Sequence, residues 1–237
     1  MKLLSSIYGR LNDFVHRHKE GVPFLVYVVF YMIWFTIIED RIKVPEYVIH
    51  LSIDDKIPFI PEFIIPYELW FAYVLGSVLY FLFTDKNDFY RTFLFLTTGM
   101  TIFLVVSTLW PNGQTLRPVL TGREGFFENM VLQLYRADTP TNVCPSIHVY
   151  NSLGVEFAVA RSERLKKHKI IRFLSLVLCI LIILSTVFIK QHSLFDVMTA
   201  LCLGGLMYYL VYSLDIIRIL REYRDRKQLE KEHISGK

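Results

Sequence analysis

The chain has 237 residues, of which 53% are hydrophobic, 15% aromatic and 20% charged, with a modest net charge of +4. A mean hydropathy of +0.38 excludes a disordered chain, and three cysteines are too few for a small secreted scaffold held by disulfides. An ordinary soluble domain is less apolar and more charged. The composition therefore indicates an integral membrane protein.

Six segments predict membrane-spanning helices, because a span needs about 20 mostly apolar residues. The last two segments are the most apolar. The fourth is short and contains His148, Asn151 and Glu156, so its hydropathy alone does not decide whether it spans the membrane. Gly204 and Gly205 are interpreted as positions where helices pack closely. The expected fold is an all-α bundle of six transmembrane helices, at 22–39, 67–84, 92–110, 146–161, 170–190 and 195–217.

Both ends of the chain are predicted to lie outside this single membrane domain at 22–217. Residues 1–21 are too polar for a signal peptide and lack a small-residue cleavage site, so we expect a cytoplasmic amphipathic lead-in. Residues 218–237 form a basic tail with interleaved acids. This pattern after a span favours a solvated cytoplasmic helix over a nucleic-acid-binding patch, and no nucleic acid is expected as a partner.

The distribution of lysine and arginine predicts the orientation of the bundle. With the N-terminus inside, the cytoplasmic segments contain 19 of the 26 basic residues. Since cytoplasmic loops carry the excess of positive charge, both termini are expected in the cytoplasm of a multi-pass cell-membrane protein. The basic segments are 1–21, 85–91, 161–172 and 218–237.

Three polar segments fall at the opposite, extracytoplasmic face in this topology. They are 110–118 (WPNGQTLRP), 144–148 (CPSIH) and 185–196 (STVFIKQHSLFD). Polar and ionisable residues at a membrane are costly unless they are partnered or face water. Their clustering on one face therefore predicts a functional site.

The residue types in these segments suit phosphoryl transfer. Arg117 offers a planar guanidinium to phosphate oxygens, and Ser146 begins a helix whose N-terminal amides favour an anion. His192 precedes Asp196 by four residues, so both share one helical face. A carboxylate on one ring nitrogen leaves the other as a nucleophile, and His148 could protonate the leaving oxygen.

These motifs resemble those of the type 2 phosphatidic acid phosphatase superfamily. PSIH at 145–148 is similar to its P-S-G-H motif, and Arg117-Pro118 to the end of its K-x6-R-P motif. Ser185, His192 and Asp196 match the spacing of S-R-x5-H-x3-D. The resemblance covers roughly residues 60–215.

The resemblance implies a metal-independent mechanism through a phosphohistidine, with no cofactor. His192 would be the nucleophile, Asp196 its orienting partner and His148 the general acid, while Arg117 and Ser146 would bind phosphate. The implied substrate is a membrane lipid phosphate or diphosphate at the extracytoplasmic face. The lipid and the oligomeric state stay open.

Two motif cations are absent, because Trp110 replaces the lysine and Thr186 the second arginine. Lys190 is a candidate to supply one of them as a phosphate-binding residue. The departures resemble the branch with inositol phosphotransferases and ceramide-headgroup synthases. Transfer of a lipid headgroup to an alcohol is thus the first alternative.

Some of these residues also have a purely structural interpretation. Asp196 could only cap a helix, Lys190 could extend to the interface from the end of its span, and Arg117 could be a topological anchor. Residues 112–114 predict a turn and nothing more. Residues 124–136 predict an interfacial helix that either packs on the bundle or guides an acyl chain. Asp54 and Asp55, in the outer loop 40–66, have no assigned role.

Two further functions remain as alternatives. Two histidines and a carboxylate also describe a non-haem iron triad, although iron would not need the RP and PSIH segments. A non-catalytic lipid-binding or transport protein would account for the missing lysine and arginine. The joint presence of His148, His192 and Asp196 argues against such a protein.

Overall fold

The computed structural model describes residues 21–123 and 125–235, so the predicted lead-in at 1–21 lies, apart from Gly21, outside the described residues. Helices dominate the described chain, as the sequence predicts. They are α2 (Val22–Arg41), α3 (Ile64–Thr84), α4 (Lys86–Leu109), α5 (Phe126–Ala137), α6 (Ile147–Arg161), α7 (Lys169–Phe188), α8 (Leu194–Tyr208) and α9 (Ile216–Ser235). The short elements are β1 (Tyr47–Val48), η2 (Asp54–Lys56), η3 (Pro61–Phe63), β2 (Asn112–Gly113) and a π-helical turn, η4 (Tyr209–Ser213).

Five helical segments among the described residues are long and apolar enough to cross a membrane. Each overlaps one of the predicted spans, with ends that differ by up to six residues. They are Val22–Arg41, Pro61–Thr84, Lys86–Leu109, Lys169–Phe188 and Leu194–Ser213. The remaining predicted span, 146–161, corresponds to α6, whose 15 residues are fewer than the roughly 20 needed to cross a whole bilayer.

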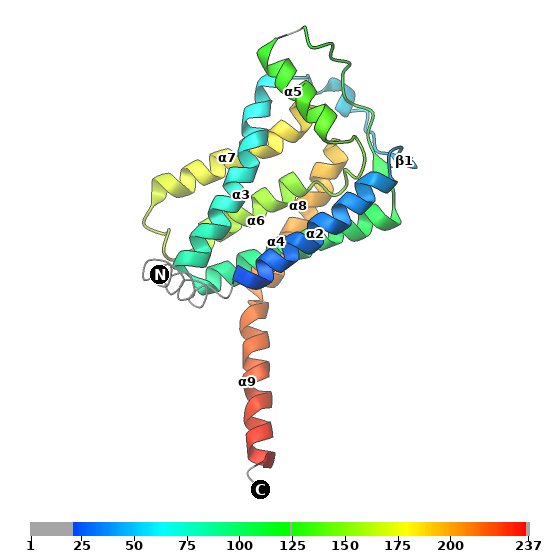
Figure 1. Cartoon of the computed structure of the whole chain (residues 1–237). Helices are drawn as coiled ribbons and strands as arrows, with labels where there is room; N and C mark the ends of the chain where they lie inside the picture. Colours follow the sequence, from blue (N-terminus) through cyan, green and yellow to red (C-terminus); the bar gives the residue numbers. More distant parts are fainter. Residues whose placement is uncertain (1–20, 124, 236–237) are drawn as a thin grey trace, which may run out of the picture.

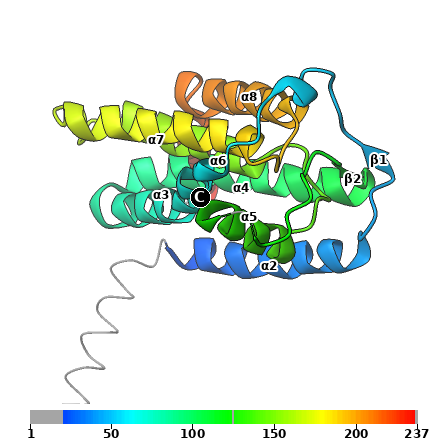
Figure 2. The same cartoon turned by 90° about the horizontal axis from the view of Figure 1, so that it is seen from above.

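α6 is the central helix of the bundle, which explains why it is less apolar than its neighbours. It packs against α3, α4, α7 and α8 (Figures 1 and 2). Tyr150, Asn151, Ser152 and Val155 of α6 are all buried. A helix surrounded by other helices contacts protein instead of lipid, so it can carry polar side chains that a lipid-facing helix would expose.

α2 lies at the edge of the bundle against α4 (Figure 2). Tyr27 of α2 donates a hydrogen bond of 2.9 Å to the carbonyl of Thr97. Most of the other side chains of α2 are at least partly exposed, as expected for an apolar helix that contacts lipid on its outer face.

The two glycines of α8 differ in their surroundings. A Cβ at Gly204 would lie 2.8 Å from Leu153 Cδ1, so close packing there is confirmed. A Cβ at Gly205 would have no neighbour within 4 Å. The prediction of close packing at Gly205 was therefore wrong, because that residue is exposed on the surface of the bundle.

The segment 112–114, which the sequence predicts to be a turn, contributes the short strand β2 instead. β2 pairs in parallel with β1, so Asn112 lies opposite Tyr47 and Gly113 opposite Val48. The Asn112 side-chain oxygen accepts hydrogen bonds of 2.9 Å from the amides of Val143 and Cys144. The turn prediction was wrong because these contacts join segments far apart in the sequence, which local patterns cannot show.

The C-terminal helix α9 extends away from the bundle (Figure 1). It begins after Asp215, which has a positive φ of 47° and pairs with Arg91 at 2.9 Å. Arg221 donates a hydrogen bond of 2.8 Å to Asn87. The chain therefore leaves the bundle near the start of α4, at the end opposite to the predicted site.

Candidate functional site

The three polar segments singled out in the sequence meet at one end of the bundle. The backbone amide of Ser146 donates to the carbonyl of Asp196 at 3.4 Å, which joins the starts of α6 and α8. The Gln114 side-chain amide donates to the carbonyl of Lys190 at 2.9 Å. These contacts bring the segments into one structural unit.

His192 and Asp196 lie on the same side of the start of α8. His192 Nδ1 is 3.3 Å from Asp196 Oδ2, and both side chains are almost fully buried. The same carboxylate oxygen accepts from the Ser193 amide at 3.0 Å and completes a capping box. Asp196 is thus both a helix cap and the partner of a histidine, as the predicted spacing allows.

His148 stands beside this pair in the first turn of α6. Its ring centroid is 6.0 Å from that of His192. Tyr67 stacks on it at 4.4 Å and Trp70 contacts it at 4.3 Å, both from α3. Its buried Nδ1 atom has no hydrogen-bond partner among the described residues. The aromatic rings therefore fix the orientation of the imidazole and leave its polar atoms available.

Ser146 is the N-cap of α6 and is fully buried. Its Oγ accepts a hydrogen bond of 3.4 Å from the Val149 amide. The side chain is therefore committed to the helix end, where backbone amides favour an anion. The predicted phosphate-binding role rests on this position at the helix N-terminus.

Arg117 is held by the segment that joins α5 to α6. It donates to the carbonyls of Asp138 at 2.7 Å and Thr139 at 3.1 Å, and to Gln191 Oε1 at 2.5 Å. Tyr135 offers both its carbonyl, at 3.3 Å, and its ring face. Burial lowers the pKa of the guanidinium, whose ordinary value is so high that it stays charged at neutral pH.

These contacts occupy all four N–H groups on the two terminal nitrogens of Arg117, leaving its Nε buried without a hydrogen-bond partner among the described residues. The predicted phosphate-binding arginine is thus also a clamp. It fixes Gln191 next to His192 and offers a ligand one N–H group in this arrangement.

Lys190 points toward the outer loop. Its Nζ donates to the carbonyls of Asp54 at 2.7 Å and Ile57 at 2.5 Å. Burial lowers its pKa, while the carboxylates of Asp54 and Asp55 oppose that shift. Two of its three N–H groups are therefore used by the protein, which limits Lys190 as a replacement for the missing motif cations.

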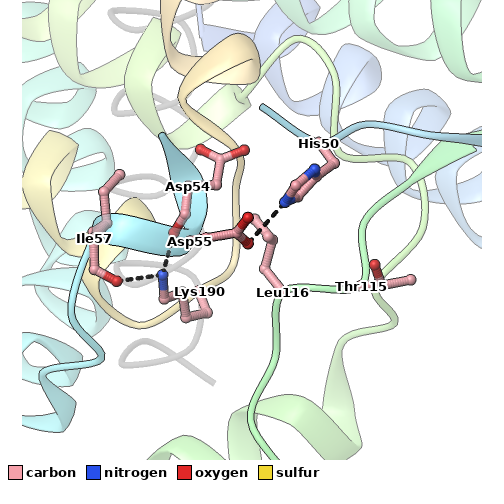
Figure 3. Close-up of a pocket in the computed structure, with 7 residues that line it drawn as sticks. All are labelled: His50, Asp54, Asp55, Ile57, Thr115, Leu116 and Lys190. Carbon is pink, nitrogen blue, oxygen red and sulfur yellow. Dashed lines mark hydrogen bonds and ion pairs between the residues drawn. The ribbon is translucent and has the colours of Figure 1, made fainter. Parts of the chain in front are cut away.

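Lys190 also lines a polar cavity of about 360 Å³ between the outer loop and the segment before Arg117 (Figure 3). Asp55 and His50 form a pair of 2.8 Å at its rim. The other lining residues are Asp54, Ile57, Thr115 and Leu116.

The two residues that replace motif cations, Trp110 and Thr186, supply no positive charge to the site. Thr186 is fully buried, and its hydroxyl donates to the carbonyl of Ile183 at 2.8 Å. Its carbonyl accepts from the amides of Gln191 and His192, both at 3.0 Å. Trp110 packs against the cluster of Ile49, Val143 and Cys144. The substitutions therefore serve the loop structure.

Two glutamines around His192 have structural roles that sequence reasoning did not assign. Gln191 accepts from Arg117 and donates to Asp138 at 3.1 Å. Gln114, only 2% exposed, joins the carbonyl of Lys190 to the amide of Leu116. Polar residues in loops carry no periodic signal, so only their partners reveal these roles.

Asp54 is the third residue whose role the sequence left unassigned. Its side chain is buried, and it accepts hydrogen bonds from Ser193 Oγ at 2.6 Å and from the Leu194 amide at 2.9 Å. It therefore caps α8 from a loop about 140 residues earlier in the chain.

α5 covers this end of the bundle with one apolar face. Val131 is fully buried with Ile64, Tyr67 and Ile189, and the partly buried Phe127, Met130 and Leu134 pack against them. The packing interpretation of this segment is confirmed. A role in guiding an acyl chain stays a prediction.

Residues 21–123 and 125–235 contain no group of three or more histidine, cysteine, aspartate or glutamate side chains arranged to hold a metal ion. An iron triad would require such a group. His148, His192 and Asp196 are instead arranged as one His–Asp pair with a second imidazole beside it.

A comparison with known families found one match, which covers part of the chain. Residues 113–218 match the family model of the PAP2 superfamily. This range contains all six predicted site residues, whereas Asp54 and the outer loop lie before it. No curated protein matches the chain.

Proposed function

We propose that this chain, whose residues 113–218 match the PAP2 superfamily, is a member of that superfamily and a metal-independent phosphohydrolase for a membrane lipid phosphate or diphosphate. The observation that carries the proposal is the His192–Asp196 pair at 3.3 Å with His148 beside it. One imidazole is oriented by a carboxylate and the second lies close enough to serve the same phosphoryl group, which is what a two-histidine mechanism requires.

The proposed reaction begins with attack by Nε2 of His192 on phosphorus. Asp196 accepts the Nδ1 proton in a hydrogen bond and stabilises the imidazolium that forms. The bond between phosphorus and the lipid oxygen breaks, and protonated His148 donates a proton to that oxygen. Water, deprotonated by His148, then attacks the phosphohistidine and releases phosphate, which restores both histidines.

The proposed anion site combines a helix end with a single arginine N–H group. The amides at the start of α6, behind Ser146, and the free Nε of Arg117 are the candidates to hold phosphate oxygens. Lys190 could contribute its one remaining N–H group. The site faces the extracytoplasmic side in the topology that the basic residues predict.

Two observations favour a second candidate, a non-catalytic lipid-binding protein. Arg117 and Lys190 spend most of their donors on backbone carbonyls, and two motif cations are replaced by Trp110 and Thr186. Weak phosphate binding would follow from this shortage of donors. The two candidates differ in whether His192 becomes phosphorylated.

The deciding experiment measures phosphate release from a panel of lipid phosphates and diphosphates by the purified protein in detergent, with EDTA present. Wild type is compared with His192→Ala and with His168→Ala, a matched control because His168 lies at the start of α7 at the other end of the bundle. We expect EDTA-resistant release that falls at least about 1,000-fold in His192→Ala and is retained in His168→Ala. No release from folded wild type would contradict hydrolysis.

Two additions to the same assay separate the alternatives. Acid-labile, base-stable label on the protein after brief incubation with ³²P-labelled substrate would identify a phosphohistidine. Headgroup transfer is the better description if that label forms and an added alcohol changes the product. Without the alcohol, phosphate would be released; with the alcohol, an alcohol phosphate would form in its place. If no label forms with any lipid, the non-catalytic candidate is favoured.

A further inference from the structure

Two side chains join the outer loop to the segment that carries His192. Lys190 donates to the carbonyls of Asp54 and Ile57, while the Asp54 carboxylate accepts from Ser193 Oγ and the Leu194 amide. Each segment thus holds the other by a charged group. We call Asp54, Lys190 and Ser193 the clasp; its Asp54 and Lys190 appear in Figure 3.

The clasp is buried and its charged groups are well partnered. Asp54 is 1% exposed, and its carboxylate also accepts from the Leu51 amide at 2.8 Å. A buried carboxylate is costly unless hydrogen bonds satisfy it, and the N-terminus of a helix such as α8 favours a negative charge. Asp54 therefore occupies a site built for an anion.

The clasp encloses the proposed nucleophile. Only Gln191 and His192 lie between Lys190 and Ser193. Lys190 has a positive φ of 54°, a conformation that non-glycine residues rarely adopt, so neighbouring contacts must hold this backbone in place. The clasp supplies such contacts on both sides of His192.

The clasp also controls the partner of His192. Asp196 Oδ2 accepts from the Ser193 amide and lies 3.3 Å from His192 Nδ1. Because Asp54 holds Ser193 Oγ and the next amide, it fixes the residue to which Asp196 is bonded. A displacement of Ser193 would change the distance between Asp196 and His192.

We propose that Asp54 is a positioning residue, which acts through Ser193 to hold Asp196 against Nδ1 of His192. The inference rests on the proposed function of the His192–Asp196 pair. Asp54 lies outside the matched family range and touches neither histidine in the contacts described, so its effect is on geometry. Displacements of about 1 Å can lower a reaction rate about 100-fold.

The neighbouring residue provides a matched control. Asp55 carries the same charge one position later, but its side chain is 66% exposed and pairs with His50. Figure 3 shows the two carboxylates on the same short helix, with Asp55 turned toward His50. Removing either carboxylate therefore removes one charge from this loop, but only removal of the Asp54 carboxylate breaks the clasp.

The test compares Asp54→Asn with Asp55→Asn in the full chain, using the lipid phosphate that wild type hydrolyses best. We expect Asp54→Asn to lower kcat about 10-fold to 100-fold, with KM changed less than threefold, and Asp55→Asn to stay within about twofold of wild type. Equal effects of the two variants, or an Asp54→Asn effect confined to KM, would overturn the proposal.

A double-mutant cycle checks the route through Ser193. If Asp54 acts through that hydroxyl, Asp54→Asn combined with Ser193→Ala should cost little more than the larger single change, because the two share one interaction. Additive losses would contradict this route. Ser193→Ala also serves as the test variant if Asp54→Asn does not fold, since it keeps the buried carboxylate bonded to the Leu194 and Leu51 amides.

A spectroscopic readout separates this inference from the proposed function. In ¹⁵N-histidine-labelled protein, the signals of His192 are identified by their loss in His192→Gln, and the Nδ1–H form is expected in wild type. Asp54→Asn should shift these signals toward a mixture of tautomers, whereas Asp55→Asn should not. Unchanged signals in Asp54→Asn would overturn the positioning role even in an active enzyme. A shifted signal in a protein that releases no phosphate would contradict the proposed function alone.

Discussion

Arg117 shows how one residue can combine a motif position with a structural task. Its guanidinium reaches two backbone carbonyls before α6 and the side chain of Gln191 beside the proposed nucleophile. The planar guanidinium can donate to several acceptors that lie in different directions. The ammonium group of a lysine has all its donors on one nitrogen and cannot reach them together. The identity of this residue as arginine therefore matters even without a bound phosphate.

Arg117→Lys is expected to lower the free energy of unfolding by about 2 kcal/mol, because at least one buried carbonyl loses its charged donor. The thermal midpoint of the purified protein in detergent measures this effect. Arg136→Lys is the control, since Arg136 is an exposed cation in the last turn of α5. Equal midpoints for the two variants would show that the hydrogen bonds of Arg117 contribute nothing to the stability of the protein.

At the scale of elements, the position of α6 is set by close packing against α4. Tyr150 of α6 stacks on Phe95 at 4.7 Å and donates to its carbonyl at 2.8 Å. Gly99 leaves the space that the Tyr150 ring occupies, because a Cβ there would lie 1.9 Å from Tyr150 Cε1. Since His148 lies in the first turn of α6, this contact also positions the proposed general acid.

Gly99→Ala is expected to destabilise the protein by about 1–3 kcal/mol, since the added methyl group displaces a buried tyrosine. Gly205→Ala is the matched control on α8, where the added methyl group has open space and the helix gains from the better propensity of alanine. The thermal midpoints of the two purified variants in detergent measure the difference in stability. A Gly99→Ala protein as stable as Gly205→Ala would argue against tight α4–α6 packing.

At the scale of the whole molecule, the site and those basic segments that the structure describes lie at opposite ends of the bundle. The polar loops with Asp55 and Lys190 gather at one end, while the segment 161–172 and the start of α9 lie at the other. The excess of lysine and arginine predicts that this second end is cytoplasmic. The proposed active site would then face outward.

Single cysteines at the two ends test this orientation. The side chain of Asp55 is 66% exposed and that of Glu163 is 83% exposed, so cysteine at either position is accessible to reagents. A membrane-impermeant maleimide should label Asp55→Cys in intact cells and Glu163→Cys only after permeabilisation, with wild type as the background. The reverse pattern would place the site in the cytoplasm.

Much of the fold and the core of the site could be predicted because their signals are local. Apolar runs of about 20 residues appear as helices in the structure at the predicted places. The four-residue spacing of His192 and Asp196 is enough to place them on one face of a helix start. These features depend on covalent geometry and on the polarity of the surroundings, which the order of residues specifies directly.

Tertiary structure alone decided which groups the charged residues contact. Lys190 was predicted to be a phosphate ligand and Asp54 was left without a role, yet each binds the other's segment. Arg117 uses two of its four terminal N–H groups for carbonyls of a loop about 20 residues later in the chain. The sequence shows that a cation is present, but its free donors depend on which backbone carbonyls folding brings within about 3 Å. That proximity is set by the packing of the whole bundle.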